Sequence, residues 1–214
     1  MVIKTRARSE AAKEKRLQTL LQVARPLVAA KSFDDLKMAE VAEAAGVAKG
    51  TVFLYFPTKE ALCLALLEAE LHDWLADLGA QLEQPGRWSE KRLARAFVET
   101  LSPRPLFLKL LGLLSTVLEH NLPLPTVVAF KERLLLALVE HGALLERRLP
   151  KLSPGEGARL LLRVDAVVVG LSQLASPSPV VAQALALPHL QSLVVDFEPE
   201  LLATLTALFV GYAD

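Results

Sequence analysis

The sequence predicts an all-α fold, and three features of the chain support this. Apolar residues recur at spacings of three and four along almost the whole chain, which is the period of a helix with one buried face. No long segment shows the apolar-polar alternation with period two that a half-buried strand needs. Glycine is scarce, with 10 residues among 214, so few positions interrupt a helical pattern. We therefore expect helices throughout.

The first predicted helix covers about residues 10–30. Its apolar residues fall on one face, as expected for a helix that packs on a core. Pro26 lies inside the helix, removes one backbone hydrogen bond and should bend it. The apolar face consists of Leu17, Leu20, Leu21, Ala24, Leu27 and Val28.

Two short helices joined by a tight turn are predicted within residues 37–59. Val41 and Ala42 form the apolar face of the first, and the small Ala42 allows a close helix crossing. Gly46 ends this helix, because glycine adopts the left-handed conformation favoured after a helix C-terminus. Val52 lies on the apolar side of the second helix, whose start is basic. Ordinary helical hairpins share this spacing, but a tight pair of this kind is also the arrangement with which helix-turn-helix proteins read DNA.

Capping and turn residues divide the rest of the chain into further helices. Thr58 and Ser89 are good N-caps, and Pro85-Gly86 separates the two helices that they begin. Ser153-Pro154-Gly155-Glu156 is a capping box that predicts proline at the first helical position. The expected ranges are about 58–82, 89–101, 105–121, 125–149, 153–175, 179–187 and 199–212.

The charges are unevenly distributed, although the formal net charge is zero. Residues 1–60 hold 11 Lys and Arg against 7 Asp and Glu, and the first 31 residues hold 8 against 2. A basic end on a neutral chain suits a nucleic-acid-facing module joined to a module with another task, although a solvated basic tail has the same composition. The hydrophobic content of 52% predicts a subunit interface and an apolar cavity in addition to a core.

The sequence also favours one cellular compartment. Cys63 is the only cysteine, which excludes an intrachain disulfide and fits a reducing compartment. The N-terminus is charged and lacks the apolar run of a signal peptide. The longest stretch without charged residues, 166–195, contains three prolines and is unsuited to a membrane span. We therefore expect a cytoplasmic protein with no membrane partner.

The two short helices and their flanks carry a longer motif. It consists of Glu40-Val41-Ala42, Ala45-Gly46-Val47, Lys49-Gly50-Thr51, Phe53, Phe56, Lys59-Glu60 and Leu62. With this motif the chain resembles the TetR family of bacterial transcriptional regulators over roughly residues 12–66. The resemblance implies a three-helix DNA-binding domain over residues 1–57. A fourth helix then joins it to a helical effector-binding and dimerisation domain over residues 58–214.

The resemblance also implies which residues contact DNA. Lys49 can reach a phosphate or a guanine edge, Gly50 permits close backbone approach, and Thr51 offers its hydroxyl or methyl group. Tyr55 and Lys59 are expected to anchor phosphates, which positions the protein without reading bases. The aromatic residues of the second helix have core packing as an alternative role. The full set is Lys37, Lys49, Gly50, Thr51, Phe53, Tyr55 and Lys59.

Three departures from the family pattern concern this region. Ala48 stands where the family usually has Ser or Thr, so the second helix lacks a side-chain N-cap. Lys37 replaces the usual Thr at the start of the first helix, and Phe53 replaces a frequent Tyr. Because these changes affect which residues discriminate bases, we predict no operator sequence.

By the same resemblance, the C-terminal helices bind a small effector and pair two subunits. Helices 153–175 and 199–212 are expected to form the dimer bundle, with interior helices of a monomer as the alternative. Few charges occur along the C-terminal helices, which favours an apolar or amphipathic effector. Arg163 and Asp165 either orient its polar end or form an interface ion pair. The candidate lining residues, each of which has core packing as its alternative, are Trp74, Phe97, Phe107, Leu111, Leu114, Phe130, Leu134, Leu138 and Asp165.

The favoured function is a ligand-responsive regulator. It is expected to be a repressor that binds a double-stranded operator with an inverted repeat as a homodimer and is released by its effector; an activator has the same sequence features. An enzyme is disfavoured because no nucleophile elbow, phosphate loop or paired-cysteine motif occurs, and we expect no metal and no cofactor. The remaining alternative is a helical adaptor that binds protein through an apolar surface. The four histidines, which lack metal-ligand spacing, are His72, His120, His141 and His189.

Overall fold

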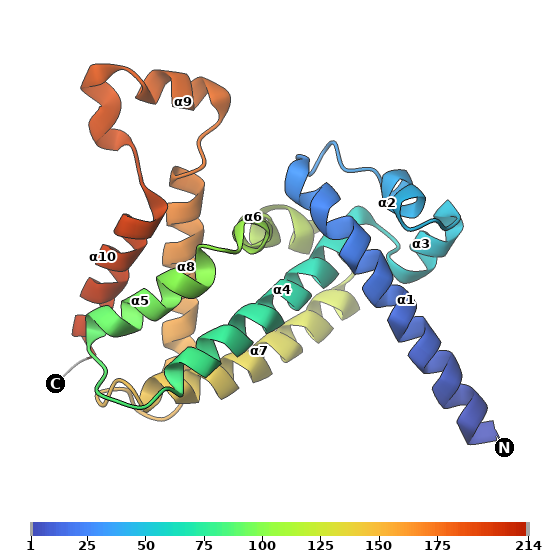
Figure 1. The fold of residues 1–214 in the computed structure, drawn as a ribbon, viewed down its shortest axis with the longest axis horizontal. Helices are drawn as coiled ribbons and strands as arrows, with labels where there is room; N and C mark the ends of the chain where they lie inside the picture. Colours follow the sequence, from blue (N-terminus) through green and yellow to red (C-terminus); the bar gives the residue numbers. More distant parts are fainter. Residues whose placement is uncertain (1, 213–214) are drawn as a thin grey trace. The chain divides into compact units, whose positions relative to one another are not determined.

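The computed structural model describes the backbone of residues 2–212 and the side chains of residues 12–212 (Figure 1). This described part consists of helices and their connections and contains no strand, which confirms the all-α prediction. It forms two compact units. The first unit comprises the residues up to Ala69 together with Leu113–Leu122, and the second comprises Glu70–Gly112 and the residues from Pro123 onward. The first of these divisions falls within one helix, after Ala69. The boundary expected at residues 57/58, between a DNA-binding domain and an effector-binding domain, stays a prediction.

The first unit contains the N-terminal helices. Its long helix α1 begins at Val2 rather than near residue 10, because its first turns lack an apolar stripe and periodicity gives no signal there. Helix α1 also continues through Pro26. The elements are α1 (Val2–Ala30), α2 (Met38–Ala44), α3 (Lys49–Tyr55), the first part of α4 (Lys59–Leu82), the π-helix η1 (Leu114–Leu118) and the 3-10 helix η2 (Glu119–Asn121).

The core of the first unit comes from the apolar faces predicted for these helices. Leu20 and Ala24 of α1, Val41 of α2, Val52 of α3 and Leu62 of α4 are completely buried. Burial of side chains from four helices holds the short α2 and α3 in place, since helices of seven residues are marginal by themselves in water.

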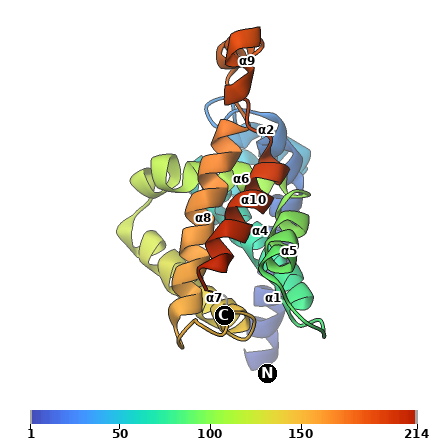
Figure 2. The same cartoon turned by 90° about the vertical axis from the view of Figure 1, so that its left-hand side faces the viewer.

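The second unit is built around contacts between helices far apart in sequence. Helix α10 packs against α5 and α8, and α7 packs against α8, as the two views in Figures 1 and 2 show. The elements are the remainder of α4, α5 (Glu90–Leu101), α6 (Pro105–Leu113), α7 (Leu124–Glu146), α8 (Glu156–Leu174), α9 (Pro179–Leu185), the 3-10 helix η3 (Pro188–Leu193) and α10 (Phe197–Val210).

A row of aromatic side chains forms the interior of the second unit. The ring of Trp74 lies 5.4 Å from that of Phe107 and 6.3 Å from that of Phe97, whose ring lies 5.6 Å from that of Phe209. The indole N–H of Trp74 donates to the hydroxyl of Thr100 at 3.1 Å, which satisfies a buried donor. This row connects α4, α5, α6 and α10 in one core.

Side-chain capping explains the starts of α4, α5 and α9. The hydroxyl groups of Thr58 and Ser89 accept backbone N–H groups of their own helices at 3.1 and 3.2 Å, as predicted. Ser178 caps α9 in the same way at 3.4 Å.

The predicted start of α8 is wrong. The helix begins at Glu156 rather than with Pro154 in its first turn, because Gly155 takes a left-handed φ of 90°. Only half of the capping box forms, with the N–H of Ser153 donating to the Glu156 carboxylate at 2.8 Å. A carboxylate oxygen of Glu146, the last residue of α7, instead accepts the N–H groups of Gly155 and Gly157 at 2.8 and 2.9 Å.

Helices α7 and α8 approach each other through two glycines. A Cβ on Gly142 would lie 2.4 Å from the backbone nitrogen of Ala158, and a Cβ on Gly157 would lie 2.1 Å from the carbonyl oxygen of Gly142. Both distances are far shorter than any real contact, and the atoms met belong to backbone that cannot move aside. Only glycine fits at this crossing.

We predict that Gly142→Ala destabilises the second unit by at least the ~1–3 kcal/mol typical of overpacking. Gly50→Ala is the matched control, because Gly50 lies in helix α3 with nothing within 4 Å of its added Cβ. The control is expected to be neutral or stabilising by up to ~1 kcal/mol through helix propensity. Thermal and denaturant unfolding of both variants measures the difference, and equal stabilities would contradict the close crossing.

Candidate nucleic-acid interface

The turn between α2 and α3 has the geometry expected from its glycine. Gly46 has a left-handed φ of 62°, and its N–H donates to the carbonyl of Glu43 at 3.0 Å. The N–H of Val47 donates to the carbonyl of Ala42 at 3.0 Å. These bonds close the turn within four residues and fix the direction in which α3 leaves it.

Both motif helices begin without a side-chain cap. Lys37 and Ala48 occupy the N-cap positions in extended conformations, and neither side chain accepts a backbone N–H. This confirms the effect expected from Ala48. The N–H of Thr51 is bonded to the carbonyl of Ala48 at 2.8 Å.

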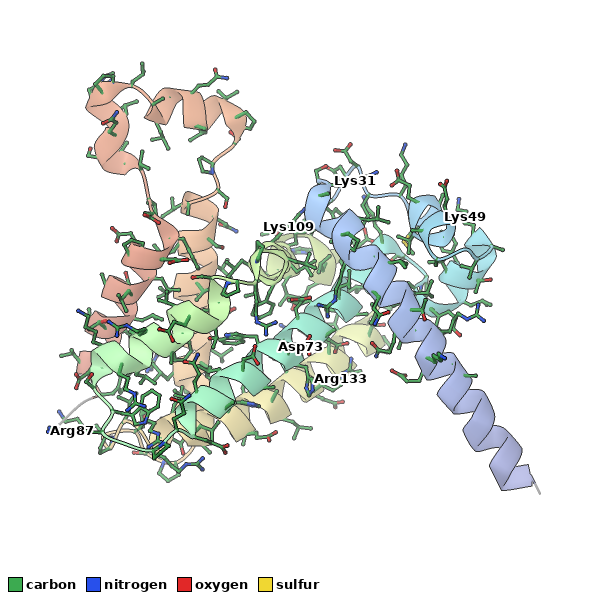
Figure 3. All side chains as sticks on the ribbon, viewed as in Figure 1. Lys31, Lys49, Asp73, Arg87, Lys109 and Arg133 are labelled. Carbon is green, nitrogen blue, oxygen red and sulfur yellow. The ribbon has the colours of Figure 1, made fainter. Side chains whose placement is uncertain are left out.

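Helix α3 has one buried side and one exposed side. Val52 is completely buried and Phe56 is 3% exposed, so these two residues attach the helix to the unit. On the other side, Lys49 and Gly50 are exposed, as is Phe53, which keeps 39% of its surface in solvent. Figure 3 marks Lys49 at the start of α3. The sequence-predicted residues at the start and centre of α3 thus share a surface.

Gly50 has no role inside the protein that requires glycine. Its φ is not in the left-handed region, and a Cβ added there would have no atom within 4 Å. Gly50 is the second residue of α3, and glycine within a helix costs stability relative to alanine. The open side of this residue therefore faces a space that a close partner could occupy.

The other predicted contacts lie around this surface. Lys37 is exposed at the start of α2, while Thr51 and Tyr55 are half-buried. The ammonium group of Lys49 lies 5.6 Å from the centre of the Phe53 ring, a cation–π arrangement that orients both side chains.

Lys59 has a structural partner inside the first unit. Its ammonium group donates to the carbonyl of Phe33 at 2.9 Å and lies 4.2 Å from the centre of the Phe33 ring. It therefore holds the connection between α1 and α2 against the start of α4. A phosphate contact by Lys59 would have to be added to this interaction or replace it.

An ion pair fixes α2 against the end of α1. The ammonium group of Lys31 lies 2.6 Å from a carboxylate oxygen of Glu40, and both side chains are one-third exposed. The hydrogen bond from Lys31 lowers the pKa of Glu40 below its ordinary value, because it stabilises the ionised carboxylate. Neither partner was predicted to interact in this way.

Leu54 is a surface residue that sequence reasoning missed. It is 82% exposed, beside Phe53 and one turn after Gly50, and so belongs to the exposed side of α3. Helical spacing could have found it, since residues 50, 53 and 54 lie on one face. Its apolar side chain suits contact with a thymine methyl group or a sugar.

The candidate effector residues are divided between the two units. Trp74, Phe97, Phe107 and Phe130 are buried in the second unit, whereas Leu114 belongs to the first unit. The remaining leucines on α6 and α7 are partly or wholly buried: Leu111, Leu134 and Leu138.

The two charged effector-site candidates on α8, Arg163 and Asp165, contact different groups. The guanidinium group of Arg163 lies over the ring of Tyr212, 5.9 Å from its centre, and hydrogen-bonds its hydroxyl. Asp165 is exposed as a residue, yet loss of hydration around its carboxyl raises its pKa, an effect that the positive charge of Lys131 opposes. Arg163 and Asp165 therefore have different neighbours.

Among the described residues, no three His, Cys, Asp or Glu side chains are placed to hold a metal ion. No single described helix has both the length and the apolar composition to cross a membrane, although three sharply bent helix pairs meet both conditions together. Of the basic N-terminal residues, Lys4, Arg6 and Arg8 have side chains outside the described range.

Comparison with known proteins relates both parts of the chain to one family. The family model described as "Bacterial regulatory proteins, tetR family" matches residues 20–66, and the one described as "Tetracyclin repressor-like, C-terminal domain" matches residues 68–214. The HTH-type transcriptional regulator RutR of Escherichia coli is 39% identical over 75 residues. This match covers 35% of the present chain and only 34% of the length of RutR.

Solved structures share the fold along most of the chain. A TetR transcriptional regulator from Legionella pneumophila has a TM-score of 0.56 and 15% identity, covering 92% of this chain and 96% of that one. The fatty acid degradation regulator FadR from Bacillus halodurans has a TM-score of 0.56 and 17% identity, covering 92% and 95%. At such identities the similarity concerns the fold.

We predict a pH-dependent effect of Glu40→Gln. Because the pKa of Glu40 is lowered in the folded state, its ionised form contributes stability above the ordinary value of 4.5, and this contribution is lost as pH falls through the lowered pKa. The variant should therefore melt below the parent at pH 7, and the gap should close at acid pH. Glu43→Gln, at an exposed position of the same helix, is the control. A gap that does not change with pH would contradict the assigned role.

Proposed function

Because this chain belongs to the TetR family of bacterial transcriptional regulators, we propose that it is a ligand-responsive repressor acting as a homodimer in the cytoplasm. It binds an inverted-repeat operator and leaves it when a small apolar or amphipathic effector binds. The family consists of DNA-binding regulators and not of enzymes. The observation that carries the proposal is the exposed side of α3, where Lys49, Gly50, Phe53 and Leu54 lie together.

In this proposal α3 enters the major groove of the operator. Its buried side holds it to the unit through Val52, so its exposed side is free to face base edges. Lys49 contacts a phosphate or a guanine, Thr51 offers its hydroxyl or methyl group, and Gly50 lets the backbone come close. Phe53 and Leu54 add apolar contact.

Residues around α3 would position the protein on the DNA backbone. Lys37 is exposed at the start of α2 and can meet a phosphate. Tyr55 would donate its hydroxyl, and Lys59 would offer the charge that now binds the Phe33 carbonyl. Such contacts carry no sequence information and make the affinity depend on salt.

The outward sides of α8 and α10 support a dimer. On α8, Leu162 is 50% exposed, and Ala166 and Gly170 follow it at intervals of four on the same side. On α10, Ala203 and Ala207 are exposed at the same spacing, and no charged residue occurs from 201 to 210. Small and apolar residues on two adjacent helices allow close packing with the same helices of a second copy.

The interior of the second unit supports the class of effector. It is lined by aromatic and aliphatic side chains, and among the described residues Glu70 and Thr100 are its only buried polar residues. Thr100 is hydrogen-bonded to Trp74, and Glu70 lies 3.9 Å from the guanidinium group of Arg104. An effector that separates these side chains would be mainly apolar, with few polar groups.

Regulation follows from linkage between the two sites. An effector weakens DNA binding if it prefers the dimer conformation that DNA disfavours, and DNA then weakens effector binding by the same factor. Equal affinity for both conformations would produce no regulation.

The test is selection of random and genomic DNA fragments on the purified full chain at near-physiological salt, followed by sequencing. We expect enrichment of an inverted repeat, because two copies of α3 related by a two-fold axis read the same half-site in opposite directions. Release of the selected DNA by an apolar metabolite fraction would support the effector. Binding without enrichment, or no binding by folded protein, would contradict the proposal and favour the adaptor.

We further predict that Gly50→Ala separates DNA binding from stability. The variant should melt at or above the parent temperature, because the added methyl group meets no atom within 4 Å and alanine favours the helix by ~0.5–1 kcal/mol. Its affinity for the selected operator should fall at least ~10-fold through steric exclusion at the groove. Glu99→Ala, at an exposed position of α5 outside the proposed DNA and dimer surfaces, serves as the control. Unchanged affinity would remove Gly50 from the interface.

A further inference from the structure

Helix α1 is much longer than the part of it that packs on the first unit. It begins at Val2, whereas the first of its described side chains to be buried is Leu20. The side chains of residues 12–16 are all exposed. We call residues 2–16 the α1 extension, which is about 22 Å long at 1.5 Å per residue. In both Figures 1 and 2 it projects away from α2 of the same unit.

The α1 extension carries a net positive charge, although the whole chain is neutral. It holds six Lys and Arg against two Glu, a balance of +4. Lys13, Lys15 and Arg16 have exposed side chains, and none of them forms an ion pair with an Asp or Glu whose side chain the structure describes. The nearby carboxylate of Glu14 instead accepts from the amide of Gln18 at 2.9 Å. The positive charges of the three residues are therefore open to an anionic partner.

The backbone of the α1 extension is helical although no side of it packs on a core. Its sequence lacks an apolar stripe, and a helix that is polar on all sides is only marginally stable in water. A solvated basic tail would need no helix. Here the helix continues without a break into the buried part of α1, so the first unit fixes the direction of these charges. A partner that neutralises them would stabilise this arrangement.

We propose that the α1 extension binds DNA phosphates outside the half-site that α3 contacts. The inference rests on the proposed function, because the partner is the duplex that α3 holds. Helices α1 and α3 belong to one unit and share its core through Leu20 and Val52. Figure 1 shows the extension passing α3 and projecting beyond it. Its length of about 22 Å equals about six base-pair steps of 3.4 Å, so it can follow the backbone past the half-site.

Duplex DNA fits the composition of the α1 extension better than other anionic partners do. The extension contains no Trp, Tyr or Phe. Proteins that bind single-stranded nucleic acid stack bases on aromatic side chains, and helices that bind anionic membranes pair a basic side with an apolar one. A duplex backbone requires only positive charge at its phosphates. These contacts position the protein without reading bases, so the bound DNA should be longer than the inverted repeat.

The first test measures how the affinity of the full chain for the selected operator depends on salt. Fluorescence anisotropy follows binding between ~50 and ~200 mM salt, and the slope of log affinity against log salt counts the phosphates neutralised. We expect this slope to fall by at least ~2, because the variant removes three charges from each of two chains. The variant combines Lys13→Gln, Lys15→Gln and Arg16→Gln.

The matched control removes three exposed charges from the second unit and should change the slope by less than ~1. It combines Lys91→Gln, Arg95→Gln and Arg147→Gln. Glutamine keeps the helix propensity of Lys and Arg, so both variants should fold, and thermal melting checks this. Equal slopes for the two variants would overturn the inference. A lowered melting temperature with an unchanged slope would also overturn it, because the charges would then serve the chain itself.

The second test locates the contact on the DNA. The selected operator is made in two lengths, one ending at the inverted repeat and one continuing for ~10 base pairs, about one helical turn, on each side. We expect the parent and the control variant to bind the longer duplex at least ~5-fold more tightly. The variant of the α1 extension should lose this preference. A variant that keeps it, or a parent without it, would overturn the contact outside the half-site.

These results separate the α1 extension from the proposed function. A parent that selects an inverted repeat, with a variant that matches the control, overturns the extension contact and leaves the repressor intact. If the parent selects no sequence, the salt slope is measured on a duplex of random sequence. A lower slope for the variant than for the control would then support the extension contact and contradict the proposed function.

Discussion

The backbone contact between Gly142 and Gly157 determines the arrangement of the second unit. Because neither residue has a side chain, α7 and α8 can cross at the shortest distance that their backbones allow. The Glu146 carboxylate then accepts the first N–H groups of α8 and ties its start to the end of α7. The direction in which α8 leaves this crossing in turn places its outward side and the return of α10 onto α5.

Sequence periodicity and capping residues were sufficient to predict most of the fold. The helices that bury one side against a core, such as α3 with Val52, repeat their apolar residues at the helical period. Thr58 and Ser89 mark helix starts because their hydroxyl groups satisfy backbone donors, a local interaction that needs no tertiary information. The candidate DNA surface was predicted from the motif that resembles the TetR family, and helical spacing then places its Gly50 and Phe53 on one side of a short helix.

The features that sequence reasoning missed depend on contacts between distant residues. The capping box at Ser153 forms only in part, because Glu146 from the preceding helix takes over the cap. The motif predicts that Lys59 anchors a phosphate. In the structure its ammonium group binds the carbonyl of Phe33 and lies over the Phe33 ring. Neither competing partner is visible from local spacing. The exposure of α9 could not be foreseen either, since an apolar segment in a sequence reads as core until its burial is known.

The uncapped start of α3 has a consequence for temperature. This helix has seven residues and no side-chain cap, so its local stability comes largely from the burial of Val52 and Phe56. Short helices of this kind open locally at a lower free energy than the unit as a whole. On warming, α3 should therefore open before the rest of its unit does, and any recognition through its exposed side should weaken at that point.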